Sequence, residues 1–301
     1  MIRVGTCSWA DDSFVKAYYP KGVDRLSYYA ERFDVVEANS TFYRLPGEQL
    51  VAGWAEKLPD GFTMHVKAFG LMTRHPVKIE AVPEDLRAEM PVDDRGRVDR
   101  PSPELRGEVF RRFLAALEPL RQAGRLGGIL MQLAPYVVAK PASYDYLAWA
   151  AEQLAGHDVL VEFRHRSWFE QPAEPLRFLE EHRLTYVTVD APVFPLVVAE
   201  TSPIGYVRFH GRNRDTWYKR TGSTAERFDY LYSEQELAEW AGTLRELEQR
   251  AEVVYAMFNN NGRSAAIDAP RNLLGELDRR AEVAQAPTNA ATLKQLLANT
   301  V

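Results

Sequence analysis

Short hydrophobic stretches recur along the chain and alternate with segments that have the hydrophobic period of a helix. The stretches rich in β-branched residues cover 3–8, 34–39, 62–67, 127–133, 158–165, 184–190, 206–211 and 253–260. The helical periods cover 24–33, 47–58, 103–123, 143–155, 172–182 and 233–251. Buried strands that alternate with helices are typical of parallel βαβ units. Eight such units predict the α/β class and a single (β/α)8 TIM barrel.

We expect a barrel domain over residues 1–280 and a helical tail over 281–301 that packs on it. Two insertions interrupt the repeat, at about 70–102 and 212–232. Both follow strand ends and are therefore expected on the C-terminal face of the strands, where barrel active sites lie. Each is interpreted as a wall or lid of a binding site, with a mobile surface loop as the alternative. Residues 191–204 contain too many prolines for a full helix.

Composition agrees with a soluble globular protein of one domain. A barrel needs about 250 residues, and the chain has 301, of which 46% are hydrophobic and 26% charged. The single cysteine, Cys7, excludes an internal disulfide and is expected to be a buried thiol. Met1 leads directly into the first strand, and no apolar run is long enough for a membrane span. We therefore expect a cytoplasmic protein with no membrane partner.

The strand ends carry polar and charged side chains. Counting alternate residues along each strand gives common faces for Glu37 with Asn39, His65 with Lys67, Glu162 with Arg164, Thr188 with Asp190, and Arg208 with His210 and Arg212. Barrel interiors are normally apolar, and burial of a charge costs several kcal/mol even after relaxation. We interpret these groups as a polar, partly wet pocket; the alternative is a neutral ion-pair network that fills the barrel.

Several motifs resemble those of one protein family. They are Val4-Gly5-Thr6-Cys7-Ser8-Trp9, Glu37-Ala38-Asn39-Ser40-Thr41-Phe42-Tyr43, Lys67 followed by Thr73 and His75, Gln132-Leu133, Glu162-Phe163-Arg164-His165, Arg208-Phe209-His210-Gly211-Arg212, Tyr230-Leu231-Tyr232-Ser233 and Asn259-Asn260-Asn261. Together they resemble the domain of unknown function 72 family, also called YecE-like. The resemblance implies a barrel fold and no established activity. Cys7-Ser8 replaces the small residues usual in the first motif.

The site must therefore be predicted from its chemistry. We predict the catalytic groups to be Glu37, Lys67, Glu162, His165, Asp190 and His210. A carboxylate near a second carboxylate or under apolar cover has a raised pKa, and histidine titrates near neutrality without help. Lys67 is either a Schiff-base lysine or, as we prefer, the ion-pair partner of Glu37.

A second set of residues is expected to bind the substrate. It comprises Asn39, Tyr43, Gln132, Arg164, Trp168, Arg208, Arg212, Asn259 and Asn260. The arginines favour a small anionic substrate, such as a phosphate ester or a carboxylate. The aromatic rings and amides suit a sugar-like molecule. Alternatively, the aromatic side chains pack loops onto the barrel rim, and the basic groups pair with neighbouring carboxylates.

Three functions remain open at this point. The leading one is an enzyme that uses general acid–base chemistry on a small polar anion. The second is nucleic-acid or nucleotide binding or phosphodiester processing, although a net charge of −5 argues against a general nucleic-acid coat. The third is a ligand-binding barrel without turnover. No cofactor is predicted. A divalent metal on the histidines and carboxylates is a minor alternative because Lys67, Arg164 and Arg208 lie among them.

Overall fold

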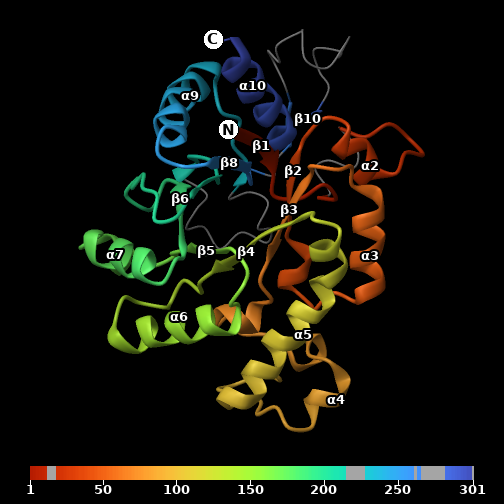
Figure 1. The fold of residues 1–301 in the computed structure, drawn as a ribbon, viewed down its shortest axis with the longest axis vertical. Coiled ribbons are helices and arrows are strands. Elements are labelled where there is room, and N and C mark those ends of the chain that lie inside the picture. Colours follow the sequence, from red (N-terminus) through yellow and green to blue (C-terminus); the bar gives the residue numbers. More distant parts are fainter. Residues whose placement is uncertain (12–17, 215–227, 261–262, 266–281, 300–301) are drawn as a thin grey trace. The chain divides into compact units, whose positions relative to one another are not determined.

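The eight predicted strands form a closed parallel barrel in chain order. The computed structural model describes residues 1–11, 18–214, 228–260, 263–265 and 282–299 (Figure 1). The strands are β1 (Ile2–Thr6), β2 (Val35–Ala38), β3 (Thr63–Lys67), β4 (Leu126–Gln132), β5 (Val159–Glu162), β6 (Thr185–Asp190), β7 (Ile204–Phe209) and β8 (Val253–Phe258). The prediction of a TIM barrel is confirmed. Most predicted strands extended one to three residues too far at their carboxyl ends, where the chain leaves the sheet.

The described helices are α2 (Arg25–Ala30), α3 (Glu48–Lys57), α4 (Glu84–Arg87), α5 (Pro103–Gln122), α6 (Pro141–Gln153), α7 (Ala173–Glu181), α9 (Glu234–Glu248) and α10 (Gln285–Asn299). Six of them follow the predicted helical periods, whereas α4 lies in the first insertion and α10 in the tail. Helix α10 lies within the segment expected to be a helical tail. No helix occurs in 191–203, as the prolines there predicted. Among the described residues, no helix is both long and apolar enough to cross a membrane.

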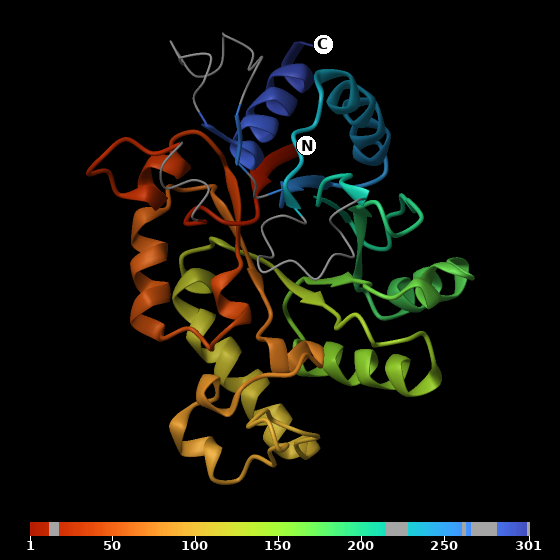
Figure 2. The ribbon, with the colours of Figure 1, turned by 180° about the vertical axis from the view of Figure 1, so that it is seen from behind.

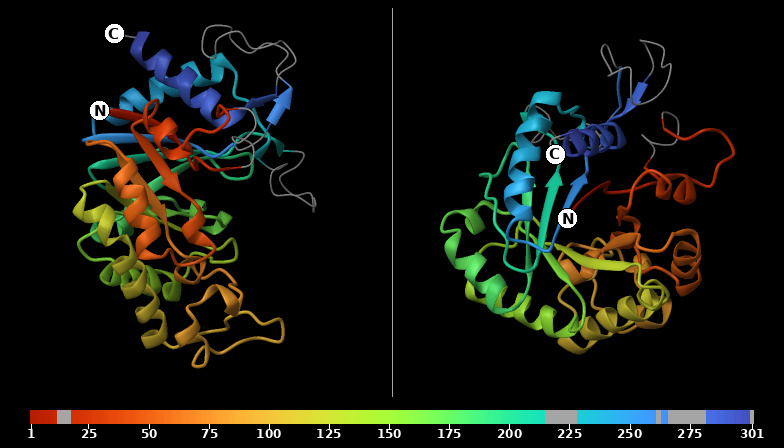
Figure 3. Two further views of the ribbon diagram at one scale, coloured as in Figure 1. Left: turned by 90° about the vertical axis from the view of Figure 1, so that its right-hand side faces the viewer. Right: turned by 45° about the horizontal axis from the view of Figure 1, so that its top comes forward.

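The chain separates into two compact units. The first contains residues 1–37 and 187–301, and the second contains residues 38–186. In the first unit, β7 pairs with β8 along its whole length and β8 pairs with β1 (Figure 3). Helices α9 and α10 lie side by side, and α10 also packs on β1 (Figure 1). Cys7 is buried, as expected.

The second unit contains β3, β4 and β5 with the helices α3 to α7. Helix α5 begins where Ser102 accepts a hydrogen bond from the Leu105 amide and Pro103 occupies the first turn. Its apolar positions recur at helical spacing, which buries one face that includes Phe110, Phe113 and Leu117. Helix α3 packs beside it (Figure 2).

The first predicted insertion lies between β3 and α5. It contains the short helices η2 (Gly70–Thr73), η3 (Ile79–Ala81) and α4, and two antiparallel bridges, Lys78 with Arg97 and Val92 with Val98. These contacts make it an ordered segment. The second insertion follows β7, but residues 215–227 lie outside the described residues.

Gly5 provides a test of the close approach of β1 and β2. A Cβ atom there would lie 2.2 Å from the carbonyl oxygen of Val35, so Gly5→Ala must displace backbone and is expected to lower the free energy of unfolding by about 3 kcal/mol. Gly53 lies in α3 with open space around it, and Gly53→Ala should raise stability by roughly 0.5–1 kcal/mol. Urea unfolding of both variants measures this; equal stabilities would contradict the assigned contact.

Candidate functional site

Glu37 and Arg208 form a buried ion pair in the first unit. Arg208 Nη2 lies 2.6 Å from Glu37 Oε1, and the Tyr206 hydroxyl donates to Glu37 Oε2 at 2.9 Å. The exposed fractions are 0% for Glu37 and 1% for Arg208. The two residues come from β2 and β7, which are not neighbours in the barrel, so their side chains meet inside it. Arg208 is therefore an ion-pair partner of Glu37 within the first unit.

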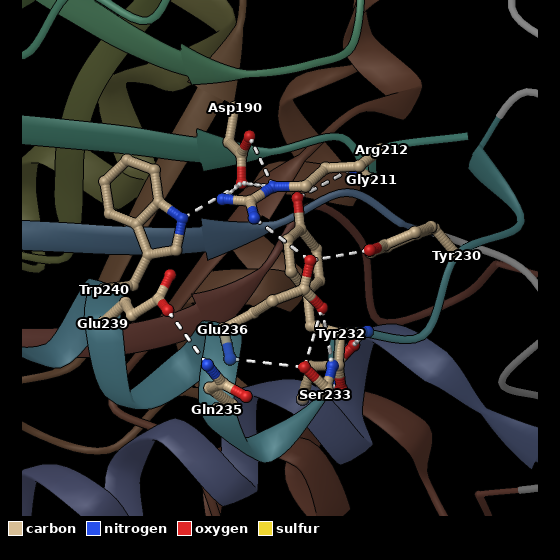
Figure 4. Close-up of polar contacts among 11 residues, drawn as sticks. Asp190, Gly211, Arg212, Tyr230, Tyr232, Ser233, Gln235, Glu236, Glu239 and Trp240 are labelled. Carbon is tan, nitrogen blue, oxygen red and sulfur yellow. Dashed lines mark hydrogen bonds and ion pairs between the residues drawn. The ribbon is translucent and has the colours of Figure 1, made fainter. Parts of the chain in front are cut away.

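Asp190, at the end of β6, receives hydrogen bonds from two directions (Figure 4). Arg212 Nε lies 3.0 Å from Oδ2 and 3.1 Å from Oδ1, and the indole nitrogen of Trp240 lies 3.0 Å from Oδ2. Because Trp240 belongs to α9 and Arg212 follows β7, the carboxylate holds three elements together. Both carboxylate oxygens of Asp190 accept these hydrogen bonds.

Glu236 extends this network to the start of α9. It accepts from Arg212 Nη1 at 3.0 Å and from the Tyr230 hydroxyl at 2.7 Å. Its other oxygen closes a capping box with Ser233 (Figure 4). The pKa of Glu236 is lowered: these hydrogen bonds and the Arg212 charge outweigh the burial that would raise it. The sequence indicated the helix start but gave no signal for the bond to Arg212.

The asparagines after β8 also contact protein groups. Asn259 Nδ2 lies 2.9 Å from His210 Nδ1. Asn260 Nδ2 donates to the Tyr230 carbonyl and to Asn289 on α10, both at 2.8 Å. The structure thus brings Glu37 to Arg208, Asp190 to Arg212 and His210 to Asn259, in contacts that pack and orient this unit.

In the second unit, charged side chains meet at the ends of β4 and β5. Glu162 and Arg164 form an ion pair, and Arg164 Nη2 donates to Gln132 Oε1 at 3.1 Å. Glu162 is buried, whereas Arg164 and Gln132 are half-buried. These three predicted residues are therefore brought together, and Arg164 and Gln132 keep part of their surface exposed.

Lys67 ends β3 beside an aromatic and an imidazole ring. Its Nζ lies 4.4 Å from the centroid of the Phe42 ring, and that ring meets His75 edge-on at 4.8 Å between centroids. The backbone of Lys67 is held by Thr41, whose hydroxyl donates to its carbonyl at 2.6 Å. His75 Nδ1 lies 2.8 Å from the Thr73 hydroxyl.

His75 has the most informative electrostatics of the site. Burial lowers its pKa, and the positive charges of Lys67 and Arg164 lower it further, to about 4, although Glu162 acts in the opposite sense. The imidazole is therefore neutral at pH 7. His75 was not among the predicted site residues; its place in the motif that starts at Lys67 was the only signal.

The other predicted residues of this unit include Tyr43, Asn39 and His165. Tyr43 is 73% exposed. Asn39 precedes the 3₁₀ helix η1 (Ser40–Phe42) and is half-buried. His165 Nδ1 accepts from the Ser167 amide at 3.2 Å, which caps the next 3₁₀ helix, η4 (Arg166–Phe169).

Trp168 corrects a prediction. Its indole is 1% exposed, stacks on Phe163 at 4.2 Å and donates to the Val137 carbonyl at 2.7 Å. No ring face remains for a substrate, so Trp168 packs the loop after β5. Trp217 and Tyr218 of the second insertion lie outside the described residues.

In the part of the chain that the structure describes, no three His, Cys, Asp or Glu side chains are grouped as a metal ion would need. Positive groups lie close to several candidate ligands. Arg208 neutralises Glu37, and Arg164 neutralises Glu162.

Comparisons with known proteins give a consistent result. The profile of the family described as "Protein of unknown function DUF72" matches residues 3–299. The UPF0759 protein YunF of Bacillus subtilis is 30% identical over 291 residues, which cover 92% of this chain and 95% of that protein. A DUF72 family protein from Thermotoga maritima superposes with a TM-score of 0.73 at 29% identity, covering 99% of both chains. One from Enterococcus faecalis gives 0.76 at 22% identity, covering 99% of this chain and 96% of that one.

The buried pair inside the barrel gives a stability prediction. Arg208→Met leaves the Glu37 carboxylate buried without its counter-charge and should lower the free energy of unfolding by about 3–5 kcal/mol. The double variant Glu37→Gln with Arg208→Met removes both charges and should recover much of that loss. Urea unfolding of the three proteins measures the coupling. A double variant no more stable than Arg208→Met would contradict charge compensation.

Proposed function

The chain belongs to the DUF72 family, and because that membership specifies no reaction, we propose a function from the side chains of residues 38–186. The protein is proposed to be an enzyme that binds a small polar anion where β3, β4 and β5 end. It transfers a proton to or from that substrate by general acid–base chemistry. Lys67 and Arg164 hold the anionic group, and His75 is the proton-transfer group.

The observation that carries this proposal is the neutral imidazole beside two cations. Lys67 contacts the Phe42 ring, and that ring contacts His75. Arg164 also lowers the pKa of His75. An anion bound to Lys67 or Arg164 offsets positive charge near the ring, so binding raises the pKa of His75. Substrate thereby moves the imidazole toward the pH at which an acid or base is effective.

The neighbouring groups have supporting roles in this proposal. Gln132 accepts from Arg164 and fixes the direction of its guanidinium. Glu162 neutralises part of the positive charge, so that the site accepts an anion without a large excess of cations. Neutral hydroxyls of a sugar-like substrate face the exposed Tyr43 phenol and the half-buried Asn39 amide.

The remaining predicted residues have structural roles here. The carboxylates of Glu37 and Asp190 are bound to Arg208 and Arg212. His210 contacts Asn259. These contacts orient the strand ends of their own unit and are not assigned a step in the reaction.

Thermal unfolding in the presence of sugar phosphates, hydroxy acids and nucleotides tests the proposal. A ligand that binds the folded state raises Tm, by the equivalent of about 2.7 kcal/mol at a hundred times Kd. We expect at least one phosphate ester or carboxylate to raise Tm by a few degrees. Lys67→Met should abolish the shift, and the control Lys140→Met, which removes an exposed charge at the start of α6, should preserve it.

Two outcomes would contradict the proposal. One is a ligand-induced shift that Lys67→Met and Lys140→Met retain equally. The other is a Tm insensitive to every small anion while single-stranded DNA or RNA binds with a steep salt dependence, the result expected of the nucleic-acid alternative.

A further inference from the structure

A cavity lies between the insertion that joins β3 to α5, the start of α5 and the loop after β4, all within residues 38–186. Its volume is about 410 Å³, which is in the range of small-molecule sites. Four arginines line it, Arg74, Arg97, Arg100 and Arg106, together with His75 and Tyr136. Asp93 and Asp99 are the acidic residues of the lining, so the formal charge of the arginines exceeds that of the carboxylates by two.

Two of the arginines have carboxylate partners. Arg97 binds Asp93 through two nitrogens, at 2.6 and 2.8 Å, and both side chains are partly buried. This pair lowers the pKa of Asp93 to about 2. Arg100 lies 3.8 Å from Asp99 in an exposed pair that contributes little. The uncompensated charge of the lining therefore belongs to Arg74 and Arg106.

Arg74 and Arg106 are held in place without carboxylate partners among the described residues. Their guanidinium carbons lie 4.6 and 5.5 Å from the centroid of the same Tyr146 ring. Arg106 also donates to the Leu71 carbonyl at 2.8 Å, and the Tyr136 hydroxyl donates to the Arg74 carbonyl. Arg74 adopts the left-handed backbone conformation, with φ of 65°, which is costly for a residue other than glycine.

Two like charges against one ring repel each other, and an anion between them removes that repulsion. Guanidinium groups bind carboxylate or phosphate oxygens through paired hydrogen bonds. The tyrosine contacts fix the two side chains before a ligand arrives, which reduces the ordering cost of binding.

The cavity also borders the proposed active site. His75 lines it and meets the Phe42 ring at 4.8 Å, and Lys67 Nζ lies 4.4 Å from the same Phe42 centroid. Lys67 Nζ is therefore no more than about 9 Å from the centre of the imidazole ring that forms part of the cavity wall. A small molecule of a few carbon atoms can extend between two such positions.

We propose that the substrate carries two anionic groups, one held by Lys67 and Arg164 and the other by Arg74 and Arg106, with His75 between them. This inference rests on the proposed function, because it assigns the first anionic group to the same site. The shared chemistry of the ligand is a short chain with a phosphate or carboxylate at each end. Arg74 and Arg106 then make molecules with two anionic groups bind more tightly than molecules with one.

Isothermal titration calorimetry at fixed ionic strength tests this. The phosphate arm compares propane-1,3-diol bisphosphate with propyl phosphate, and the carboxylate arm compares glutarate with its monomethyl ester. In at least one arm, the doubly headed compound should bind at least tenfold more tightly; the arm that does so identifies the chemistry. Arg74→Gln should abolish that advantage by weakening the doubly headed compound to the affinity of the singly headed one.

Arg95→Gln is the matched control. Arg95 is an exposed arginine of the same insertion that does not line the cavity, so this variant should retain the advantage. Equal affinities within both arms, or an advantage that Arg74→Gln retains, would overturn the inference. The proposed function would still stand if Lys67→Met weakened the singly headed compound. If Lys67→Met weakened neither compound, the proposed function would fail, and the two-headed substrate with it.

Discussion

The ionisable groups at the strand ends are buried or half-buried, so each charge needs compensation from the protein or a ligand. Removal of a charge from water costs more than most single interactions return. Inside the first unit, Arg208 and Tyr206 compensate Glu37, and Arg212 and Trp240 compensate Asp190. The alternative of an ion-pair network describes these groups better than a wet pocket does.

The buried charges in residues 38–186 are compensated in a different way. Glu162 pairs with Arg164, and Lys67 lies over an aromatic ring. Burial and, after it, the positive charges of Lys67 and Arg164 lower the pKa of His75. The neighbouring insertion adds Arg74, and the first turns of α5 add Arg106. Both guanidinium groups lie over the Tyr146 ring, and Arg106 also donates to the Leu71 carbonyl. A small anion is the ligand that such a field favours, and this is why we assign function to this unit.

The sequence predicted the eight strands and most of the helices because burial imposes a period of two or 3.6 residues on each. The same alternation correctly placed Glu37 and Arg208 on inward faces. This alternation does not apply to residues that follow the end of a strand. The sequence therefore did not predict the capping role of His165 or the burial of Trp168. The arginine cavity depends on turns and bridges within the insertion, which carry no period. His75 was overlooked because its environment is created by residues from three separate strand ends.

The titration of His75 tests the account most directly. NMR of the imidazole nitrogens should give a pKa of about 4 in the ligand-free protein, and saturating propyl phosphate or Lys67→Met should raise it. Because the native pKa lies below the ordinary value of 6.5, the unfolded chain takes up this proton first, and stability should fall as the pH drops from about 6.5 to 4. An imidazole that titrates near 6.5 and responds to neither change would contradict the account.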